Sequence, residues 1–150
     1  MEIINQDILS VKTGIIGHQV NCMGVMGAGL ALSIRKLYPQ AYSEYKDAHR
    51  TGQLFLGNVI VSEIFPPPFF IMHMCGQLGY GRKGVFTNYD AFEGCLKKIY
   101  EFRRMYYQAF ETALPMYLPY NVGCGLAGGD WMKVSNIIER VMPDTIICKI

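Results

Sequence analysis

Apolar and polar positions along the chain predict strands and helices in alternation. Apolar runs bounded by glycine or polar residues predict strands over residues 2–5, 14–20, 56–64, 69–74, 114–118 and 145–150. A period near 3.6 predicts helices over residues 28–37, 88–113 and 131–141, and a more polar helix that follows Pro39 and ends near Gly52. For residues 56–64, the period alone does not separate a strand from another buried apolar segment. Strands that alternate with helices indicate an α/β layer structure whose ligand lies beyond the carboxyl ends of the strands.

Length and charge narrow this picture. The chain has 150 residues, of which 51% are hydrophobic, and this is enough for one sizeable core. No repeat or low-complexity linker divides it, so we expect residues 1–150 to form a single domain. Lys and Arg number 14 against 12 Asp and Glu, a net charge of +2, which gives no electrostatic basis for binding nucleic acid. Nucleic acid is therefore not expected as a direct partner, whereas a compact anion held by backbone amides fits this charge.

Cysteine usage and the first residues bear on cofactors and location. The five cysteines are odd in number, lie at least 20 residues apart and form no CxxC pair, so neither a disulfide framework nor a metal site is expected. We expect no cofactor. The segment MEIINQDILSV carries acids where a signal peptide would carry positive charge, and no apolar run approaches the roughly 18 residues of a membrane span. A cytoplasmic protein without membrane contact is the expectation.

Two glycine-rich loops carry the first hint of chemistry. The 16 glycines gather in GVMGAG, LGYGRKG and GCGLAGG, and the first and last of these each join a predicted strand to a predicted helix. Backbone N–H groups and the positive end of the following helix could hold a phosphate at each loop, and two such loops on neighbouring strand ends suit a diphosphate. Taken singly, either loop is equally well explained as a simple connection.

Two common nucleotide motifs are absent. The glycines at positions 24, 27 and 29 have the spacing GxxGxG, the reverse of the dinucleotide fingerprint. No GKS or GKT follows a glycine-rich loop, which argues against hydrolysis of a nucleoside triphosphate by a Walker loop.

Longer strings resemble the macrodomains. The segments VNCMGVMGAGLALSIRKLYPQAYSEY, the preceding QDI, and LPYNVGCGLAGGDWMKV occur in the macrodomain order, and the resemblance extends over essentially the whole chain. They are most similar to the branch with ADP-ribose-1″-phosphate phosphatases, terminal ADP-ribose glycohydrolases and DNA ADP-ribosyl hydrolases, which includes short phage-encoded members. The resemblance implies a three-layer α/β macrodomain fold, with a central mixed sheet flanked by helices.

The resemblance also implies binding residues. Asp7, with the Ile8 backbone beside it, would accept a hydrogen bond from the adenine amine, and Asn21 would face the distal ribose. Without the resemblance, Asp7 reads as an exposed acid in a turn and Asn21 as a turn-stabilising amide. The residues that would contact one phosphate are Gly27, Ala28, Gly29 and Leu30. Those that would surround the other phosphate and the distal ribose are Val122, Gly123, Cys124, Gly125 and Leu126.

The sequence departs from the hydrolytic members at several positions. Where glycohydrolases carry a lysine in the central strand, this chain reads FIMHMCGQ, and Ala127 stands where an Asp follows GCGL. An aromatic residue that packs on adenine is often found near the last strand, whereas this chain ends CKI. Glycohydrolysis through a lysine adduct is therefore not expected.

His18 and Asp130 are the candidates for acid–base catalysis. A neutral imidazole can exchange a proton near pH 7, and a carboxylate can orient it or activate water. The alternative for His18 is a structural histidine buried in the core, and the alternative for Asp130 is a cap of the helix that begins at Trp131. Cys124 could act as a nucleophile, or it could simply be a small residue that fits a crowded loop. Gln77, Tyr80 and Arg82 could reach a distal group or form an exposed connection.

Three functional hypotheses remain open from the sequence. The first is an enzyme that binds ADP-ribose or a derivative and hydrolyses a group on its distal ribose, as an ADP-ribose-1″-phosphate phosphatase does. The second is a non-catalytic module that binds ADP-ribose or an NAD-derived signal. The third is an ADP-ribosyl hydrolase acting on a modified protein or nucleic acid. The expected partners are ADP-ribose, ADP-ribose-1″-phosphate or an ADP-ribosylated macromolecule.

Overall fold

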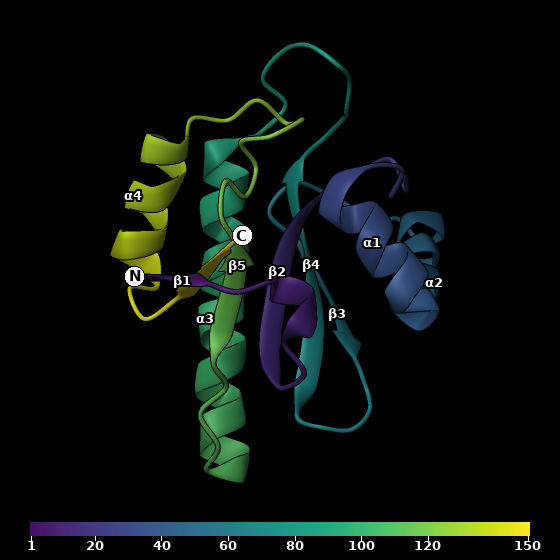
Figure 1. The fold of residues 1–150 in the computed structure, drawn as a ribbon. Helices are drawn as coiled ribbons and strands as arrows, with labels where there is room; N and C mark the ends of the chain where they lie inside the picture. The colour runs from purple at the N-terminus through teal and green to yellow at the C-terminus, as the bar shows by residue number, and fades with distance from the viewer.

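Six strands form one mixed sheet in the order β1-β6-β5-β2-β4-β3 in a computed structural model that describes residues 1–150 (Figure 1). The strands are β1 (Glu2–Asn5), β2 (Gly14–Asn21), β3 (Val59–Glu63), β4 (Phe69–Gln77), β5 (Met116–Pro119) and β6 (Ile146–Lys149). The pairs β1–β6, β6–β5, β5–β2 and β2–β4 are parallel, and β3 pairs antiparallel with β4. The carboxyl ends of five strands therefore meet at one edge of the sheet.

Helices cover both faces of this sheet, as Figure 1 shows. A short 3-10 helix, η1 (Ile8–Ser10), follows β1, and the four α-helices are α1 (Gly29–Leu37), α2 (Pro39–Arg50), α3 (Tyr89–Phe110) and α4 (Trp131–Val141). The helices α1 and α2 pack on one face, while α3 and α4 pack on the other. The α/β fold with a mixed sheet between helices is thus confirmed. None of the helices combines the length and the apolarity needed to cross a lipid bilayer.

The central strands are buried on both faces, which explains their nearly continuous apolar sequences. In β2, Ile15 faces a core cluster that includes Phe92 and Leu96 of α3, and its neighbour Ile16 faces a second cluster that includes Ile34 of α1. Successive side chains of a strand point to opposite faces, so one strand anchors both helical layers.

Polar side chains cap the helices where the sequence places them. The Asn88 side chain accepts a hydrogen bond from the Ala91 amide, which identifies Asn88 as the cap of α3. Asp130 accepts a hydrogen bond from the Met132 amide and caps α4 in the same way. By contrast, Ala28 precedes α1 and makes no side-chain cap, so the first amides of that helix have no partner from a capping side chain.

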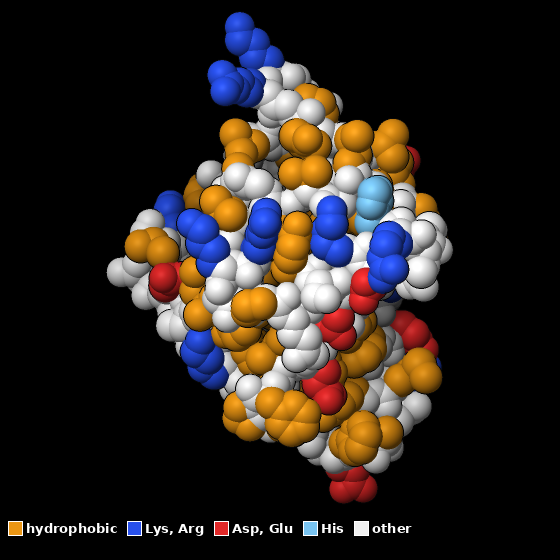
Figure 2. All heavy atoms as spheres, turned by 90° about the vertical axis from the view of Figure 1, so that its right-hand side faces the viewer, with side chains coloured by type: hydrophobic (Ala, Val, Ile, Leu, Met, Phe, Trp, Pro, Cys, Tyr) orange, Lys and Arg blue, Asp and Glu red, His pale blue; other side chains and the backbone are white.

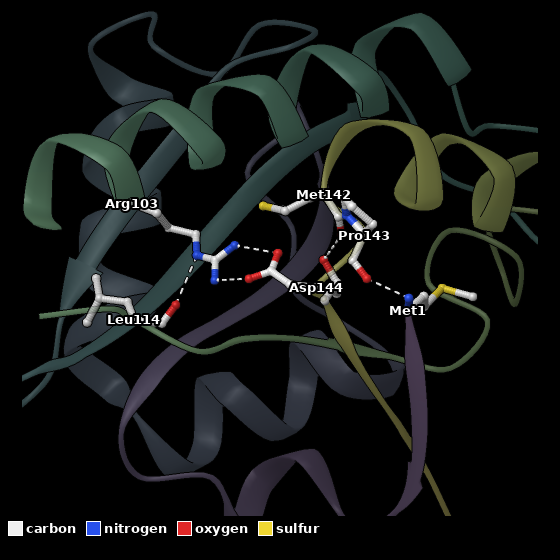
Figure 3. A network of polar contacts seen from close by, with 7 residues as sticks. Met1, Arg103, Leu114, Met142, Pro143 and Asp144 are labelled. Carbon is white, nitrogen blue, oxygen red and sulfur yellow. Dashed lines mark hydrogen bonds and ion pairs between the residues drawn. The ribbon is translucent and has the colours of Figure 1, made fainter.

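An arginine ties α3 to the two strands that follow it in the chain (Figure 3). The Arg103 Nε donates to the Leu114 carbonyl at 2.9 Å, and its two terminal nitrogens bind the Asp144 carboxylate at 3.0 and 2.7 Å. Leu114 precedes β5, and Asp144 lies between α4 and β6. The contact therefore fixes the entrances of two adjacent parallel strands, and the far end of β5 lies at the site.

Candidate functional site

A cavity of about 450 Å³ opens at the carboxyl edge of the sheet, a volume typical of small-molecule sites. Its walls come from the ends of β2, β4 and β5, the loops that follow them, and the first turn of α1. No Asp, Glu, Lys or Arg lines this cavity. Lys and Arg instead gather outside it, in a band across the face of α1 and α2 with acids close by (Figure 2). Any anion bound inside must therefore be held by neutral groups.

Asn21 folds the first loop. Its Oδ1 accepts hydrogen bonds from the Met23 and Val25 amides at 3.0 and 3.3 Å, and its Nδ2 donates to the Val25 carbonyl at 2.7 Å. Tyr45, which is fully buried, donates its hydroxyl to the Asn21 carbonyl at 2.6 Å. The Asn21 side chain lines the cavity, but the protein already uses both of its polar atoms. The structure therefore shows its turn-stabilising role.

This fold of the first loop leaves a run of backbone donors unused. The amides of Met26, Gly27 and Ala28 donate to no other protein atom. They precede the uncapped start of α1, where the helix dipole adds positive potential. Gly29 has a φ of 58°, a left-handed conformation that favours glycine at the point where the helix begins.

The second loop offers a similar set of donors. Asn121 and Gly123 have φ values of 62° and 72°, and two tight turns bond the Val122 and Cys124 amides to preceding carbonyls. The amides of the intervening and following residues, Gly123, Gly125 and Leu126, remain unpaired within the protein. Because residues of both loops line the same cavity, two sets of free donors converge on one space.

The third wall comes from the end of β4 and the loop after it. Gln77, Tyr80 and Gly81 line the cavity there. Gln19 links this wall to the second loop, because its Nε2 donates to the Gln77 Oε1 and to the Thr87 Oγ1, both at 2.9 Å. Thr87 in turn donates its hydroxyl to the Gly123 carbonyl. The second loop and the third wall are therefore held together by partly buried side chains.

His18 lies within β2, three residues before its end, among buried residues. It is only 2% exposed, and its Nε2 lies 2.8 Å from the Nδ1 of His73, whose Nε2 lies 3.0 Å from the Ser62 Oγ. Burial lowers the pKa of His18 to about 3, and burial with the neighbouring His18 lowers the pKa of His73 well below its usual value. Both imidazoles are therefore neutral at pH 7.

The structure does not join His18 to Asp130. His18 lines the cavity, whereas Asp130 lies outside its lining, and its carboxylate caps α4. No hydrogen bond connects the two side chains; the nitrogen of His18 that is bonded meets His73. The catalytic roles given to these residues stay predictions, and the helix-cap interpretation of Asp130 is the one that the geometry supports.

The other expected ligand contacts divide into two groups. Those that line the cavity are Asn21, Gly27, Ala28, Gly29, Leu30, Val122, Gly123, Gly125 and Leu126. Those that do not are Asp7, Ile8 and Cys124. Asp7 caps η1 by accepting a hydrogen bond from the Leu9 amide at 2.9 Å, and the Ile8 side chain is buried in the core beside it. Cys124 donates its thiol to the Val122 carbonyl, and burial raises the pKa of that thiol to about 11.

Sequence reasoning missed several residues of the cavity. Gln19, Val25, Ala31, Tyr120 and Asn121 line it without having been singled out. A polar Gln19 inside an otherwise apolar strand was a usable signal for a side chain directed at a site. Tyr120 packs against Trp131, with ring centroids 4.9 Å apart, and the Lys149 ammonium lies 4.2 Å from the centroid of the Tyr120 ring.

No group of three or more His, Cys, Asp or Glu side chains could hold a metal ion.

Comparisons with known proteins point to one fold family. No protein-family model matches this chain. A curated relative, the DNA ADP-ribosyl glycohydrolase of Mycobacterium tuberculosis, is 36% identical over 55 residues, which cover 37% of this chain and 16% of that protein. The chain therefore matches only a small part of the curated relative's length.

Solved structures match over nearly the whole chain. The macrodomain of Thermus aquaticus DarG covers 99% of this chain and 95% of its own, with a TM-score of 0.77 and 21% identity. A macrodomain protein from Streptomyces coelicolor has a TM-score of 0.76 and 25% identity, with 99% and 97% of the two chains covered. Thermosipho africanus DarTG, solved in complex with ADP-ribose, matches with a TM-score of 0.79 and 20% identity. The match covers 98% of this chain and 40% of that one. By the arrangement of its strands and by these likenesses, the chain is a macrodomain in fold, as its sequence motifs predict.

Proposed function

We propose that the cavity binds ADP-ribose, either free or as part of a larger molecule. The observation that carries the proposal is the convergence of unpaired amides from Gly27 and Ala28 and from Gly123, Gly125 and Leu126 on one cavity. The Thermosipho relative with the same fold was solved in complex with ADP-ribose, which supports this choice of ligand.

The chemistry of the lining fits a diphosphate. Each phosphate carries negative charge that backbone N–H groups can bind without a counter-charged side chain, and a helix N-terminus stabilises an anion through its dipole. Two donor sets on neighbouring strands match the two phosphates of ADP-ribose.

Calorimetry with ADP-ribose, AMP and NAD tests this proposal. We expect ADP-ribose to bind with a higher affinity than AMP, because AMP carries one phosphate and lacks the distal ribose, and can therefore engage only one loop fully. Equal affinities for the two compounds would show that the second loop contributes nothing and would overturn the proposal.

Removal of the 1″-phosphate from ADP-ribose is the finer prediction from the sequence. It requires an acid–base pair, and the two candidates for that pair are not hydrogen-bonded to one another. Phosphate release from ADP-ribose-1″-phosphate, measured with His18→Ala and Asp130→Ala as controls, decides the matter. If ADP-ribose binds while no phosphate appears, the phosphatase hypothesis fails.

A second candidate function is the removal of ADP-ribose from a modified macromolecule. It is favoured by the curated relative's name, DNA ADP-ribosyl glycohydrolase. Release of ADP-ribose from an ADP-ribosylated oligonucleotide, compared with an ADP-ribosylated peptide, measures this activity. No release from either substrate at saturating protein would contradict it.

A further inference from the structure

Three buried side chains form a line of hydrogen bonds across neighbouring strands. Ser62 on β3, His73 on β4 and His18 on β2 are 0%, 0% and 2% exposed. The Ser62 Oγ lies 3.0 Å from the His73 Nε2, and the His73 Nδ1 lies 2.8 Å from the His18 Nε2. The remaining nitrogen of the line, the His18 Nδ1, is buried and has no protein partner.

The positions of the protons along this line follow from counting donors and acceptors. A neutral histidine carries one N–H and one acceptor nitrogen, and a serine hydroxyl always carries a hydrogen. The one hydrogen-bond partner of the Ser62 hydroxyl is the His73 Nε2, so the hydroxyl donates to it. The His73 hydrogen then lies on Nδ1 and is donated to the His18 Nε2, which leaves the His18 hydrogen on Nδ1.

The opposite direction leaves more groups unpaired. If His18 donated to His73 and His73 donated to Ser62, the hydroxyl hydrogen of Ser62 would have no acceptor at a fully buried position. The His18 Nδ1 would also be an unpaired acceptor. Buried polar groups without partners are unfavourable, so the line runs from Ser62 towards His18.

His18, the residue that ends this line, is one of the residues that line the cavity. We infer that the His18 Nδ1–H is a fixed hydrogen-bond donor to an oxygen of the bound phosphate-containing ligand, and that Ser62 and His73 are positioning residues that set its tautomer. This inference rests on the proposed function. It adds a side-chain donor to the backbone donors of the two loops.

The same geometry assigns His18 a role other than that of a general base. Its Nε2 accepts from His73 and its Nδ1 already carries a hydrogen, so neither nitrogen has a free lone pair for a substrate proton. His18 therefore contributes to the position of the ligand and not to proton removal.

The tautomers can be observed directly in the full chain without any ligand. Long-range ¹⁵N–¹H NMR correlations distinguish a protonated ring nitrogen from a bare one, and we expect Nδ1 protonated and Nε2 bare in both His18 and His73. A His18 ring protonated at Nε2 would overturn the inference, whatever the protein binds.

Addition of ADP-ribose tests the contact itself. We expect the His18 Nδ1 and Hδ1 resonances to shift as the protein is saturated. If ADP-ribose binds and these resonances do not move, the inference fails while the proposed function stands. If ADP-ribose does not bind, the proposed function and the ligand contact both fail, and the tautomer measurement alone reports on the hydrogen-bonded line.

Ser62→Ala removes the donor at the start of the line. We expect a mixture of His73 and His18 tautomers and a loss of ADP-ribose affinity of about fivefold, the effect of one weakened hydrogen bond. Ser62→Thr keeps the hydroxyl and should retain the wild-type tautomers and affinity. Ser135→Ala on α4 makes the same chemical change far from the line and should alter neither. Unchanged tautomers in Ser62→Ala would contradict the positioning role.

Discussion

Gly125 lies in the second loop, where a Cβ added to it would meet no protein atom within 4 Å. Its backbone is outside the left-handed region, so the protein itself tolerates a larger residue there. Gly125 lines the cavity and its amide is free, so we expect the space beside it to serve the ligand. Glycine at this position would then be needed for binding and not for folding.

We expect Gly125→Ala to lower the affinity for ADP-ribose about tenfold, because a methyl group blocks the approach of the ligand to the loop amides. The change in unfolding free energy should stay within about 0.5 kcal/mol. Gly94→Ala is the matched control. Its Cβ would make only an ordinary 3.7 Å contact with the backbone of Gly57, and neither residue lines the cavity. Equal affinities of the two variants, measured by calorimetry, would contradict this role of Gly125.

Cys124 gives a second prediction at a single residue. Burial raises the pKa of its thiol to about 11, so the thiol is protonated at neutral pH and is a poor nucleophile. We expect alkylation of Cys124 by iodoacetamide, followed peptide by peptide with mass spectrometry, to be slow at pH 7 and to accelerate as the pH approaches 11. Fast labelling at pH 7 would restore the nucleophile hypothesis.

The helices and strands were predictable to different degrees. The bounds of α4 and β1 agree with the sequence pattern, and Asn88 is the cap of α3. The strand expected over residues 56–64 begins only at Val59, because Gly57 has a left-handed φ of 90°. The strand β4 extends to Gln77, beyond the apolar run, since its last residues pair with β2 regardless of their polarity.

Arg103 gives the element-scale prediction for stability. Its side chain is 16% exposed and joins α3 to the segments before β5 and β6. We expect Arg103→Ala to lower the free energy of unfolding by about 1–2 kcal/mol, from the loss of its bond to the Leu114 carbonyl and of its packing. Urea denaturation measures the loss. A smaller loss is expected from Asp144→Asn, because Asp144 is 64% exposed and solvent screens the ion pair.

The ion pair between Arg103 and Asp144 also predicts that the stability of the fold depends on pH. The hydrogen bond from Arg103 lowers the pKa of Asp144, so the folded state favours the ionised carboxylate. The stabilisation is present above the ordinary carboxyl pKa of about 4 and is lost as the pH falls through the lowered value. We expect the difference in stability between the wild type and Asp144→Asn to shrink below about pH 4. A difference that grows with acid would contradict this assignment.

At the scale of the whole molecule, the site follows from the topology. Five strands point the same way, and this brings two loops that lie about a hundred residues apart in the chain to one edge of the sheet. Glycine spacing and family resemblance were enough to predict these loops. The third wall and the link from Gln19 to Thr87 were not predictable, because they depend on how the loop after β4 folds back.

The contact between His18 and His73 was likewise not predictable from the sequence. His18 was judged alone from the sequence, and its contact with His73 arises only because β2 and β4 are neighbours with His18 opposite His73 in the register. Strand order and register are set by the packing of the whole sheet, and no local pattern reports them.

Backbone ¹⁵N–¹H NMR during a titration with ADP-ribose tests most directly whether both loops bind one diphosphate. We expect the amides of Gly27, Ala28, Gly123 and Gly125 to show the largest shifts and to follow a single dissociation constant. Shifts confined to one loop, or two loops that respond with different constants, would contradict a shared site.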